Sequence, residues 1–278
     1  MNYLYVLIPL FILILLYLIC IKPSSHGKQK CTPLMGWFYA HRGLHENASP
    51  FNSPENSLEA FKRAINSGYG IELDVQLTKD KKVVVFHDDN LSRICGIDKA
   101  ISDFTYDELR QFRLLSSNCI IPLFNDVLQL INGKVPLIVE IKAPSKADEI
   151  SIYTVKILDT YKGIYCIESF NPLSVAWFCK NRPDIIRGQL CDKFWNFPEY
   201  RGKLLYLILQ NMMFNIIAKP HFIAFNIKNK NSIPYRIIKF LYKPCTVAWA
   251  VRSDDDYINN KDEFDLIIFE NIQPGVTK

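Results

Sequence analysis

In two apolar, strand-like runs of the chain, an acidic side chain lies two residues away from another charged residue. Glu72 and Asp74 enclose Leu73 within an apolar run, and Glu140 precedes Lys142 by two residues in another such run. On a β-strand, side chains two residues apart lie on the same face. Three carboxylates facing one low-dielectric site would repel one another, and a divalent cation would relieve that repulsion. Oxygen ligands suit Mg²⁺ or Ca²⁺ better than Zn²⁺, so we predict one divalent metal ion at Glu72, Asp74 and Glu140.

Two histidines follow strand-like runs in the same half of the chain. His41 begins the sequence His41-Arg42-Gly43, and His87 is followed by Asp88. Histidine titrates near neutral pH and can act as a general acid or a general base. A single histidine, or a single inward Glu–Lys pair, is more often structural. Their joint presence at the ends of strands favours a catalytic site.

The elements that must position these side chains alternate between strand and helix patterns. Eight strands that alternate with helices in about 250 residues predict a closed (β/α)₈ TIM barrel of the α/β class. An extra strand at 82–86 and the stretch 90–123 break the alternation and predict a small insertion after the second strand. The expected strands are residues 37–41, 70–75, 135–141, 163–168, 184–190, 221–225, 245–250 and 265–269. The expected helices are residues 56–66, 146–161, 173–181, 201–218, 233–242 and 253–262.

The first 21 residues contain no charged side chain, and thirteen of the residues from Leu4 to Ile21 are Leu, Ile or Val. A helix of this length spans roughly 30 Å, about one bilayer core. We therefore expect a single-pass transmembrane anchor at residues 1–21, a juxtamembrane linker at 22–35 and the barrel domain at 36–278. A cleaved signal peptide is the alternative, but no Lys or Arg precedes the apolar run and no small-residue cleavage pattern follows it. Lysines after Ile21 predict a cytoplasmic catalytic domain.

Composition excludes several classes of protein. The chain carries 33 basic and 28 acidic residues, a net charge of +5, and 49% of its residues are hydrophobic. Such a chain is not disordered, and its small charge gives no support to nucleic-acid binding. Eight cysteines without a Cys-x-x-Cys pair indicate reduced thiols. The apolar stretch 204–218 is too short for a membrane span, and we interpret it as a packed barrel helix. Nothing in the sequence implies a protein partner.

Several motifs resemble those of the glycerophosphodiester phosphodiesterase family, over about residues 36–272. The resemblance implies a (β/α)₈ barrel with a small insertion after its second strand. It also implies metal-dependent hydrolysis of glycerophosphodiesters to glycerol 3-phosphate and an alcohol. The motifs are His41-Arg42-Gly43, Pro54-Glu55-Asn56-Ser57, Gly70-Ile71-Glu72-Leu73-Asp74-Val75, His87-Asp88, Glu140-Ile141-Lys142, Glu168-Ser169-Phe170 and Val247-Ala248-Trp249.

The same resemblance implies roles for individual residues. His41 and His87 would be the acid–base pair, and Glu72, Asp74 and Glu140 the metal ligands. Arg42 and Lys142 would bind the phosphate, and Trp249 would pack against the glycerol. The last strand ends in Glu270-Asn271, where the family often has Thr-Asp, so Glu270 receives no role.

Two other functions remain open. A phosphatidylinositol-specific phospholipase C-like diesterase would share the barrel and the histidine pair, but its metal-free forms would not need three inward carboxylates. An inactive membrane-anchored binding module would have lost site residues, and here they are present. The sequence also leaves open the substrate (a free glycerophosphodiester, a lysophospholipid or a glycerophosphate polymer), the nucleophile and the identity of the basic histidine.

Overall fold

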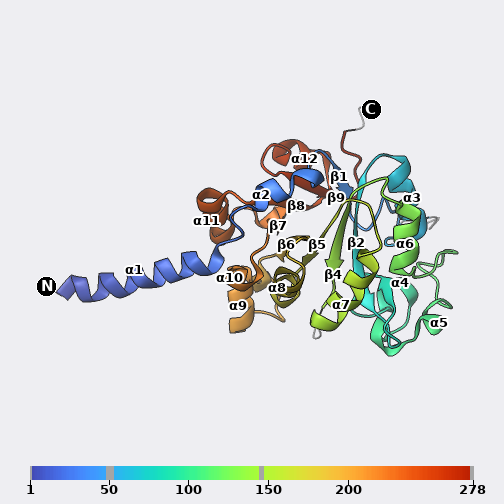
Figure 1. Cartoon of the computed structure of the whole chain (residues 1–278), viewed down its shortest axis with the longest axis horizontal. Helices are drawn as coiled ribbons and strands as arrows, with labels where there is room; N and C mark the ends of the chain where they lie inside the picture. The colour runs from blue at the N-terminus through green and yellow to red at the C-terminus, as the bar shows by residue number, and fades with distance from the viewer. Residues whose placement is uncertain (1, 48–52, 144–146, 276–278) are drawn as a thin grey trace.

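The chain folds into a closed barrel of eight parallel strands with helices outside it (Figure 1). The structure is a computed structural model that describes residues 2–47, 53–143 and 147–275. Neighbouring strands follow the order β1-β9-β8-β7-β6-β5-β4-β2, and β1 also pairs with β2, which closes the ring. The predicted barrel is confirmed. Its strands are β1 (Phe38–Ala40), β2 (Gly70–Leu77), β4 (Leu137–Ile141), β5 (Tyr165–Ser169), β6 (Ile186–Cys191), β7 (Phe222–Asn226), β8 (Cys245–Val251) and β9 (Leu266–Phe269).

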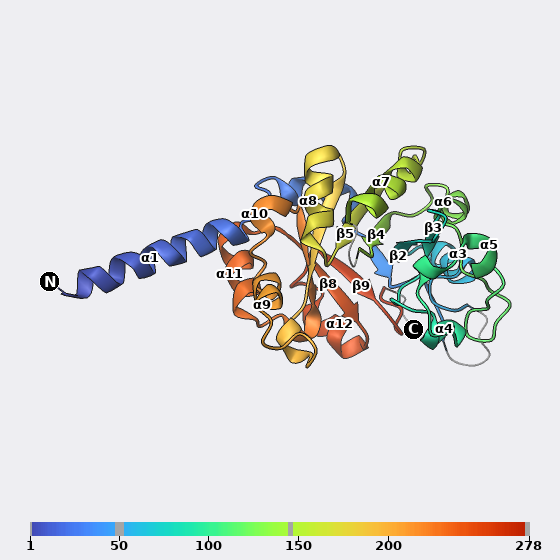
Figure 2. The same ribbon diagram turned by 90° about the horizontal axis from the view of Figure 1, so that it is seen from below.

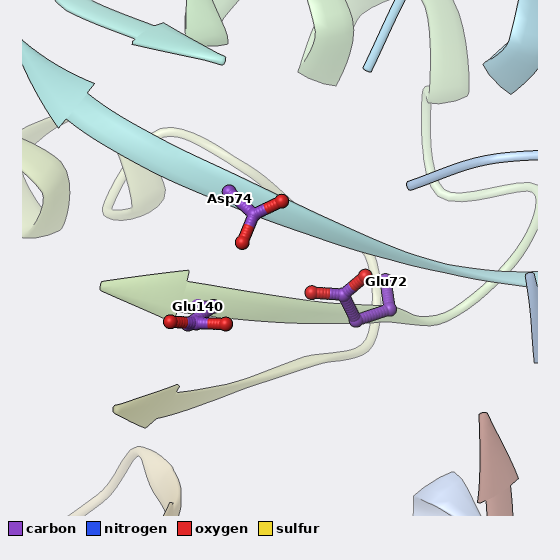
Figure 3. A group of neighbouring side chains, drawn as sticks. All are labelled: Glu72, Asp74 and Glu140. Carbon is purple, nitrogen blue, oxygen red and sulfur yellow. The ribbon is translucent and has the colours of Figure 1, made fainter. Parts of the chain in front are cut away.

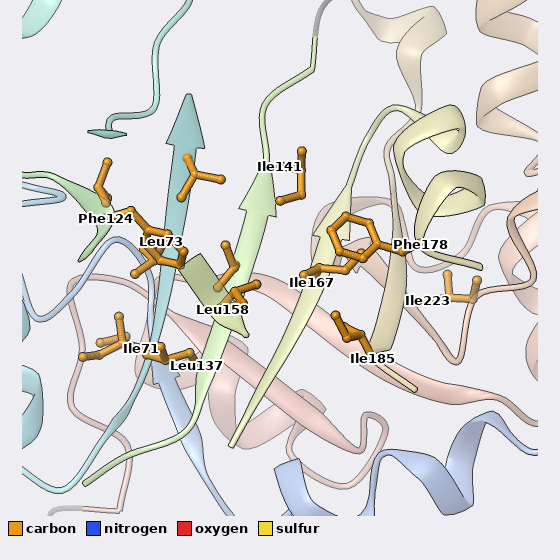
Figure 4. Packing of buried hydrophobic residues seen from close by; sticks show 14 of the residues in the cluster. Ile71, Leu73, Phe124, Leu137, Ile141, Leu158, Ile167, Phe178, Ile185 and Ile223 are labelled. Atoms are coloured by element: carbon orange, nitrogen blue, oxygen red, sulfur yellow. The ribbon is translucent and has the colours of Figure 1, made fainter. Parts of the chain in front are cut away.

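Alternation along the strands separates an inner from an outer core. Outward side chains such as Ile71 and Leu73 of β2 belong to the cluster that also contains Phe178 of α8 (Figure 4). Ile138 of β4 belongs to a second cluster, and Glu140 lies two residues further on the same face. The inner face therefore carries the acidic side chains. The outer helices are α3 (Leu58–Asn66), α6 (Phe124–Ile131), α7 (Ala147–Leu158), α8 (Pro172–Asn181), α11 (Ile233–Tyr242) and α12 (Asp254–Asn260). Lys146, the predicted first residue of α7, lies outside the described residues.

The insertion after the second strand has its own small core. Strand β3 (Val83–Val85) pairs antiparallel with β2, and it is followed by α4 (Ser92–Cys95), η2 (Ile101–Asp103) and α5 (Tyr106–Leu109). Buried side chains including Val84, Leu91 and Leu114 form a cluster of their own. The chain then returns to the barrel through α6, a helix that the sequence analysis did not predict.

Helix α1 (Asn2–Ile21) projects away from the barrel (Figures 1 and 2). Most of its large apolar side chains are exposed, for example Leu7, Phe11 and Leu16. Within the part of the chain that the structure describes, no helix combines the length and the apolar character needed to cross a bilayer. The predicted transmembrane anchor is thus not supported.

The segment between α1 and the barrel packs against the barrel rather than forming a free linker. It contains α2 (Gly27–Lys30) and η1 (Thr32–Leu34). Leu34 is fully buried in the inner core, and its carbonyl oxygen accepts a hydrogen bond from the Tyr39 hydroxyl at 2.8 Å. Lys28 forms an ion pair with Asp265 at 2.6 Å. These contacts close one end of the barrel.

The predicted helix at 201–218 is broken in two. The structure has α9 (Leu204–Gln210) and α10 (Asn215–Ala218), joined by a turn in which Met212 has a positive φ of 54°. No residue of α9 is buried. The interpretation of 204–218 as one packed barrel helix was therefore wrong for its first half.

Candidate active site

Three buried carboxylates meet on two neighbouring strands, β2 and β4 (Figure 3). Glu72 and Asp74 lie on β2, and the β2–β4 register sets Asp74 beside Glu140. One oxygen of each carboxylate lies within 4.8 Å of the others, and none of the three residues is more than 6% exposed. The structure thus brings together the three predicted metal ligands.

The pKa values of the three carboxylates reflect their burial, their mutual repulsion and the few cations beside them. Burial, and then repulsion from Asp74, raises the pKa of Glu72 well above its ordinary value. Burial also raises the pKa of Glu140. Burial acts on Asp74 in the same direction, but Lys142, His87 and Arg42 outweigh it and hold the pKa of Asp74 far below its usual range.

Lys142 supplies part of the compensating charge. Its Nζ lies 3.1 Å from Asp74 Oδ1 and 2.8 Å from Glu140 Oε1. Burial lowers the pKa of Lys142, but these two carboxylates outweigh it and the net shift is upward. In the structure Lys142 therefore contacts the acidic cluster directly, and its predicted phosphate contact stays a prediction.

A fourth acid, Glu168 on β5, lies next to this cluster. Glu168 is 1% exposed, and its Oε2 has no hydrogen-bond partner among the residues that the structure describes. Burial, followed by repulsion from Glu140, raises the pKa of Glu168 well above the ordinary value. The four buried acids outnumber the two nearby cations, Arg42 and Lys142, and Arg42 also pairs with Glu55, so negative charge is in excess when every acid is ionised. A divalent cation would offset that excess, and the three clustered carboxylates offer it an all-oxygen donor set. The residues present therefore fit one hard divalent ion.

His41 follows β1 and is held by a carboxylate from the last strand. Its Nδ1 lies 3.1 Å from Glu270 Oε2, and its Nε2 lies 3.9 Å from Glu72 Oε2. Burial, and then repulsion from Arg42, lowers the pKa of His41 to about 4, although Glu270 acts in the opposite direction. The ring is therefore neutral at pH 7 and can accept a proton.

Glu270 is one of the site residues that sequence reasoning missed. Burial raises its pKa, but hydrogen bonds from His41 and His45 outweigh this and hold the pKa of Glu270 far below its usual range. Arg252 also binds it at 2.8 Å. No local motif marks Glu270, since its partner lies 229 residues away. The available signal was alternation: Leu266 and Ile268 face the inner core, so Glu270 does too.

The turn after β1 explains why Arg42-Gly43 follows the histidine. Arg42 has a left-handed φ of 55°, and its backbone N–H donates to Glu72 Oε2 at 2.9 Å. A side chain at Gly43, where φ is 80°, would meet Phe61 and Ala60 of α3 at 3.0 Å or less. The turn thus allows the end of β1 to pack closely against α3. Its backbone N–H at Arg42 also holds the Glu72 carboxylate in place.

His87 is positioned through the insertion. Its Nδ1 lies 2.7 Å from Asp88 Oδ1. Arg93 of α4 contacts both Asp88 oxygens at 2.7 and 2.8 Å, and it also binds both oxygens of Glu55. Glu55 in turn accepts a hydrogen bond from Arg42 Nη1 at 2.7 Å. Ion pairs therefore connect His87 with Arg42, the residue that follows His41, through Arg93, another residue that the sequence analysis did not single out.

Trp249 lies on β8 and is partly exposed. Its ring meets Phe170 edge to face, with the ring centroids 5.5 Å apart, and within the described part of the chain its buried indole nitrogen has no hydrogen-bond partner. Phe170 follows β5, so both rings lie at the carboxyl ends of their strands. This arrangement places an aromatic wall at the end of the barrel that carries the acids.

Several known proteins are similar to this chain in sequence. The sequence model of the glycerophosphoryl diester phosphodiesterase family matches residues 41–191. A glycerophosphodiester phosphodiesterase of Bacillus altitudinis is 32% identical over 159 residues, which cover 53% of this chain and 63% of the relative. A human lysophospholipase D is 37% identical over 95 residues, 34% of this chain and 28% of the relative. The chain thus spans less than two thirds of the length of these relatives.

Solved structures share the fold over more of the chain. A phosphodiesterase of Oleispira antarctica, in complex with the product sn-glycerol-3-phosphate, has a TM-score of 0.69 and 21% identity, covering 85% of this chain and 94% of that protein. A glycerophosphodiester phosphodiesterase of Thermotoga maritima has a TM-score of 0.64 and 24% identity, covering 84% and 94%. At these identities the likeness establishes the barrel fold.

Proposed function

Because the chain belongs to the glycerophosphoryl diester phosphodiesterase family, we propose that it hydrolyses glycerophosphodiesters to glycerol 3-phosphate and an alcohol. The observation that carries the proposal is the meeting of Glu72, Asp74 and Glu140 beside a neutral, carboxylate-bound His41. Such a site combines ligands for a hard cation with a group that can accept a proton, which are the two requirements for hydrolysis of an anionic diester.

Glu72, Asp74 and Glu140 would hold one divalent ion, Mg²⁺ or Ca²⁺, with Glu168 beside them. When bound, the ion would supply positive charge to the phosphoryl oxygens. A thermal-unfolding titration of the chelated protein with Mg²⁺, Ca²⁺ and Mn²⁺ tests this assignment. The wild type should gain stability with at least one of them, because a ligand that binds the native state raises the unfolding temperature. No shift with any ion would contradict the proposed site.

The histidines divide the proton transfers between them. His41 holds Nδ1 against Glu270, which leaves Nε2 to accept the proton of the attacking oxygen. Glu270 then stabilises the imidazolium that forms. His87, held by Asp88, donates a proton to the leaving alcohol. We assign phosphate binding to Arg42 and Lys142, and packing against the glycerol to Trp249.

Hydrolysis of glycerophosphocholine by the full-length protein tests the reaction. Glycerol 3-phosphate and choline are expected products, and chelation should remove the activity. Phosphocholine as product, or full activity after chelation, would overturn the proposal in favour of a phospholipase C-like diesterase. Binding of the diester without turnover would favour a binding module. The Glu72→Gln variant is the matched inactive control, since it keeps the side-chain shape but removes a charge from the cluster.

Helix α1 adds a proposal about location. Its exposed apolar side chains suit attachment to a lipid bilayer, and Lys22, Lys28 and Lys30 favour the anionic cytoplasmic face. We place the catalytic domain there. Protease treatment of intact cells and of opened membranes should cleave the domain only in the opened sample. Cleavage in intact cells would contradict the cytoplasmic placement, and recovery of the protein in the salt-washed soluble fraction would contradict attachment.

A further inference from the structure

Helices α9, α10 and α11 carry large apolar side chains that face solvent. Leu204 and Leu205 of α9 are 69% and 53% exposed, and Phe240 of α11 is 79% exposed. We call the set the apolar face; its members are Leu204, Leu205, Ile216, Ile217, Phe240 and Leu241. Two views at right angles show the three helices on the side of the barrel from which α1 leaves (Figures 1 and 2).

The end of α1 is fixed against two of these helices. Asn215 of α10 donates a hydrogen bond from Nδ2 to the carbonyl oxygen of Ile21 at 2.9 Å. The Tyr242 hydroxyl of α11 donates to the carbonyl oxygen of Leu18 at 2.7 Å, and Ile21 itself is fully buried. Helices α10 and α11 therefore lie at the level where the apolar sequence of α1 gives way to Lys22.

The segment that contains α9, α10 and α11 is strongly basic. The 43 residues from Arg201 to Lys243 contain eight Lys or Arg and no Asp or Glu, whereas the whole chain has a net charge of only +5. Lys203, Lys219 and Lys243 are exposed and adjoin the three helices in sequence. Apolar side chains bordered by exposed lysines are the pattern of a surface that binds anionic lipid.

We propose that the apolar face rests on an anionic lipid bilayer, beside the point where α1 attaches. The apolar side chains enter the boundary between headgroups and acyl chains, and the lysines contact the headgroup phosphates. A second copy of the chain fits this surface less well, because two faces of the same positive charge would repel each other. The inference rests on the membrane attachment of α1 proposed above, and it adds a second contact that fixes the orientation of the barrel.

Photo-cross-linking in vesicles tests the contact on the full-length protein. The photoreactive analogue benzoylphenylalanine replaces Phe240 in one sample and Ile258 of α12 in another. Ile258 is 61% exposed and lies outside the apolar face, so it is the matched control. Burying one large apolar side chain in the lipid raises the occupancy of the lipid-bound state by about tenfold or more. With phosphatidylcholine–phosphatidylglycerol vesicles, we expect at least about tenfold more lipid adduct at position 240 than at 258. Vesicles of phosphatidylcholine alone should give less adduct.

Three results would overturn the proposal: equal lipid adducts at 240 and 258, no adduct at 240, or a protein–protein adduct at 240. Hydrolysis of glycerophosphocholine is measured in the same samples, because this soluble substrate needs no contact between the apolar face and lipid. An active enzyme without a lipid adduct at 240 overturns the contact and leaves the proposed reaction standing. An adduct in an inactive enzyme supports the contact and overturns the reaction.

Discussion

Replacing Glu270 by Gln should isolate the contribution of the carboxylate that holds His41. Gln keeps the length and the carbonyl oxygen of Glu but removes the negative charge 3.1 Å from His41 Nδ1. Both side chains are largely buried, with 12% and 17% exposed, so water replaces little of the lost interaction. Of the other partners of Glu270, Arg252 is 43% exposed and can be solvated, whereas His45, 3.6 Å from Glu270 Oε1, is 5% exposed.

The magnitude follows from the charge state of the ring. A hydrogen bond to a charged group contributes about 1.5–3 kcal/mol, and it is fully made only once His41 has become an imidazolium. Since about 1.4 kcal/mol is a factor of ten, kcat/KM should fall by about 10- to 100-fold. Glu270 also raises the pKa of His41 from a lower value to about 4. Removing that charge lowers the pKa further, so the acid limb of the pH–rate profile should move to lower pH.

The assay is release of glycerol 3-phosphate from glycerophosphocholine, followed across pH with saturating divalent cation. The control is Glu46→Gln, which removes an exposed carboxylate 3.2 Å from Arg63, a surface pair of little energetic value. The control should retain wild-type kinetics. An unchanged kcat/KM in Glu270→Gln, or an acid limb that moves to higher pH, would refute the assignment of Glu270 as a positioning residue for His41.

Three further predictions concern the remaining site residues. His41→Ala and His87→Ala should each lower kcat by about 100-fold or more. The loss of kcat in the double variant should be much smaller than the product of the two single losses. A loss equal to that product would contradict a joint proton-transfer unit. Glu72→Gln should lose both activity and the rise in unfolding temperature on adding divalent cation; a wild-type rise would contradict its role as a ligand. Lys142→Met should lower the unfolding free energy of the metal-free protein by about 3–5 kcal/mol in denaturant titrations, because it removes the ion pairs of Lys142 with Asp74 and Glu140. Divalent cation should restore more stability in this variant than in the wild type, and an equal gain in both would contradict the reasoning.

Local pattern sufficed to predict the barrel because most of its strands are short, largely apolar runs. All eight expected strands overlap observed ones, and the two carboxylates of β2 point inward as their spacing implied. The segment 204–218 misled for the same reason. Its hydrophobicity indicated burial, yet α9 has no buried residue. The prediction failed because a sequence does not show whether an apolar side chain packs against protein or against something else.

The contacts that sequence reasoning missed connect distant parts of the chain. Glu270 reaches His41 only because β9 pairs with β1 across the closed ring. Arg93 reaches Glu55 only because the insertion folds over the turn that follows β1. Ile21 was assigned to an anchor, but it is fully buried in the outer core. Alternation along the last strand places Glu270 on the inner face, but which side chains pair at such separations has no local signature, so composition and spacing could not predict the partners.

The pairing of β1 with β9 has a consequence for a chain that is still being made. His41 is synthesised early, but Glu270 and its strand follow 229 residues later. Until β9 inserts between β8 and β1, the ring is open and the histidine has no carboxylate at Nδ1. Folding of such long-range parallel pairs is slow compared with local helices. A nascent chain on the ribosome therefore carries both histidines and all three clustered acids before Glu270 is available to His41, and the proposed site is complete only once the barrel has closed.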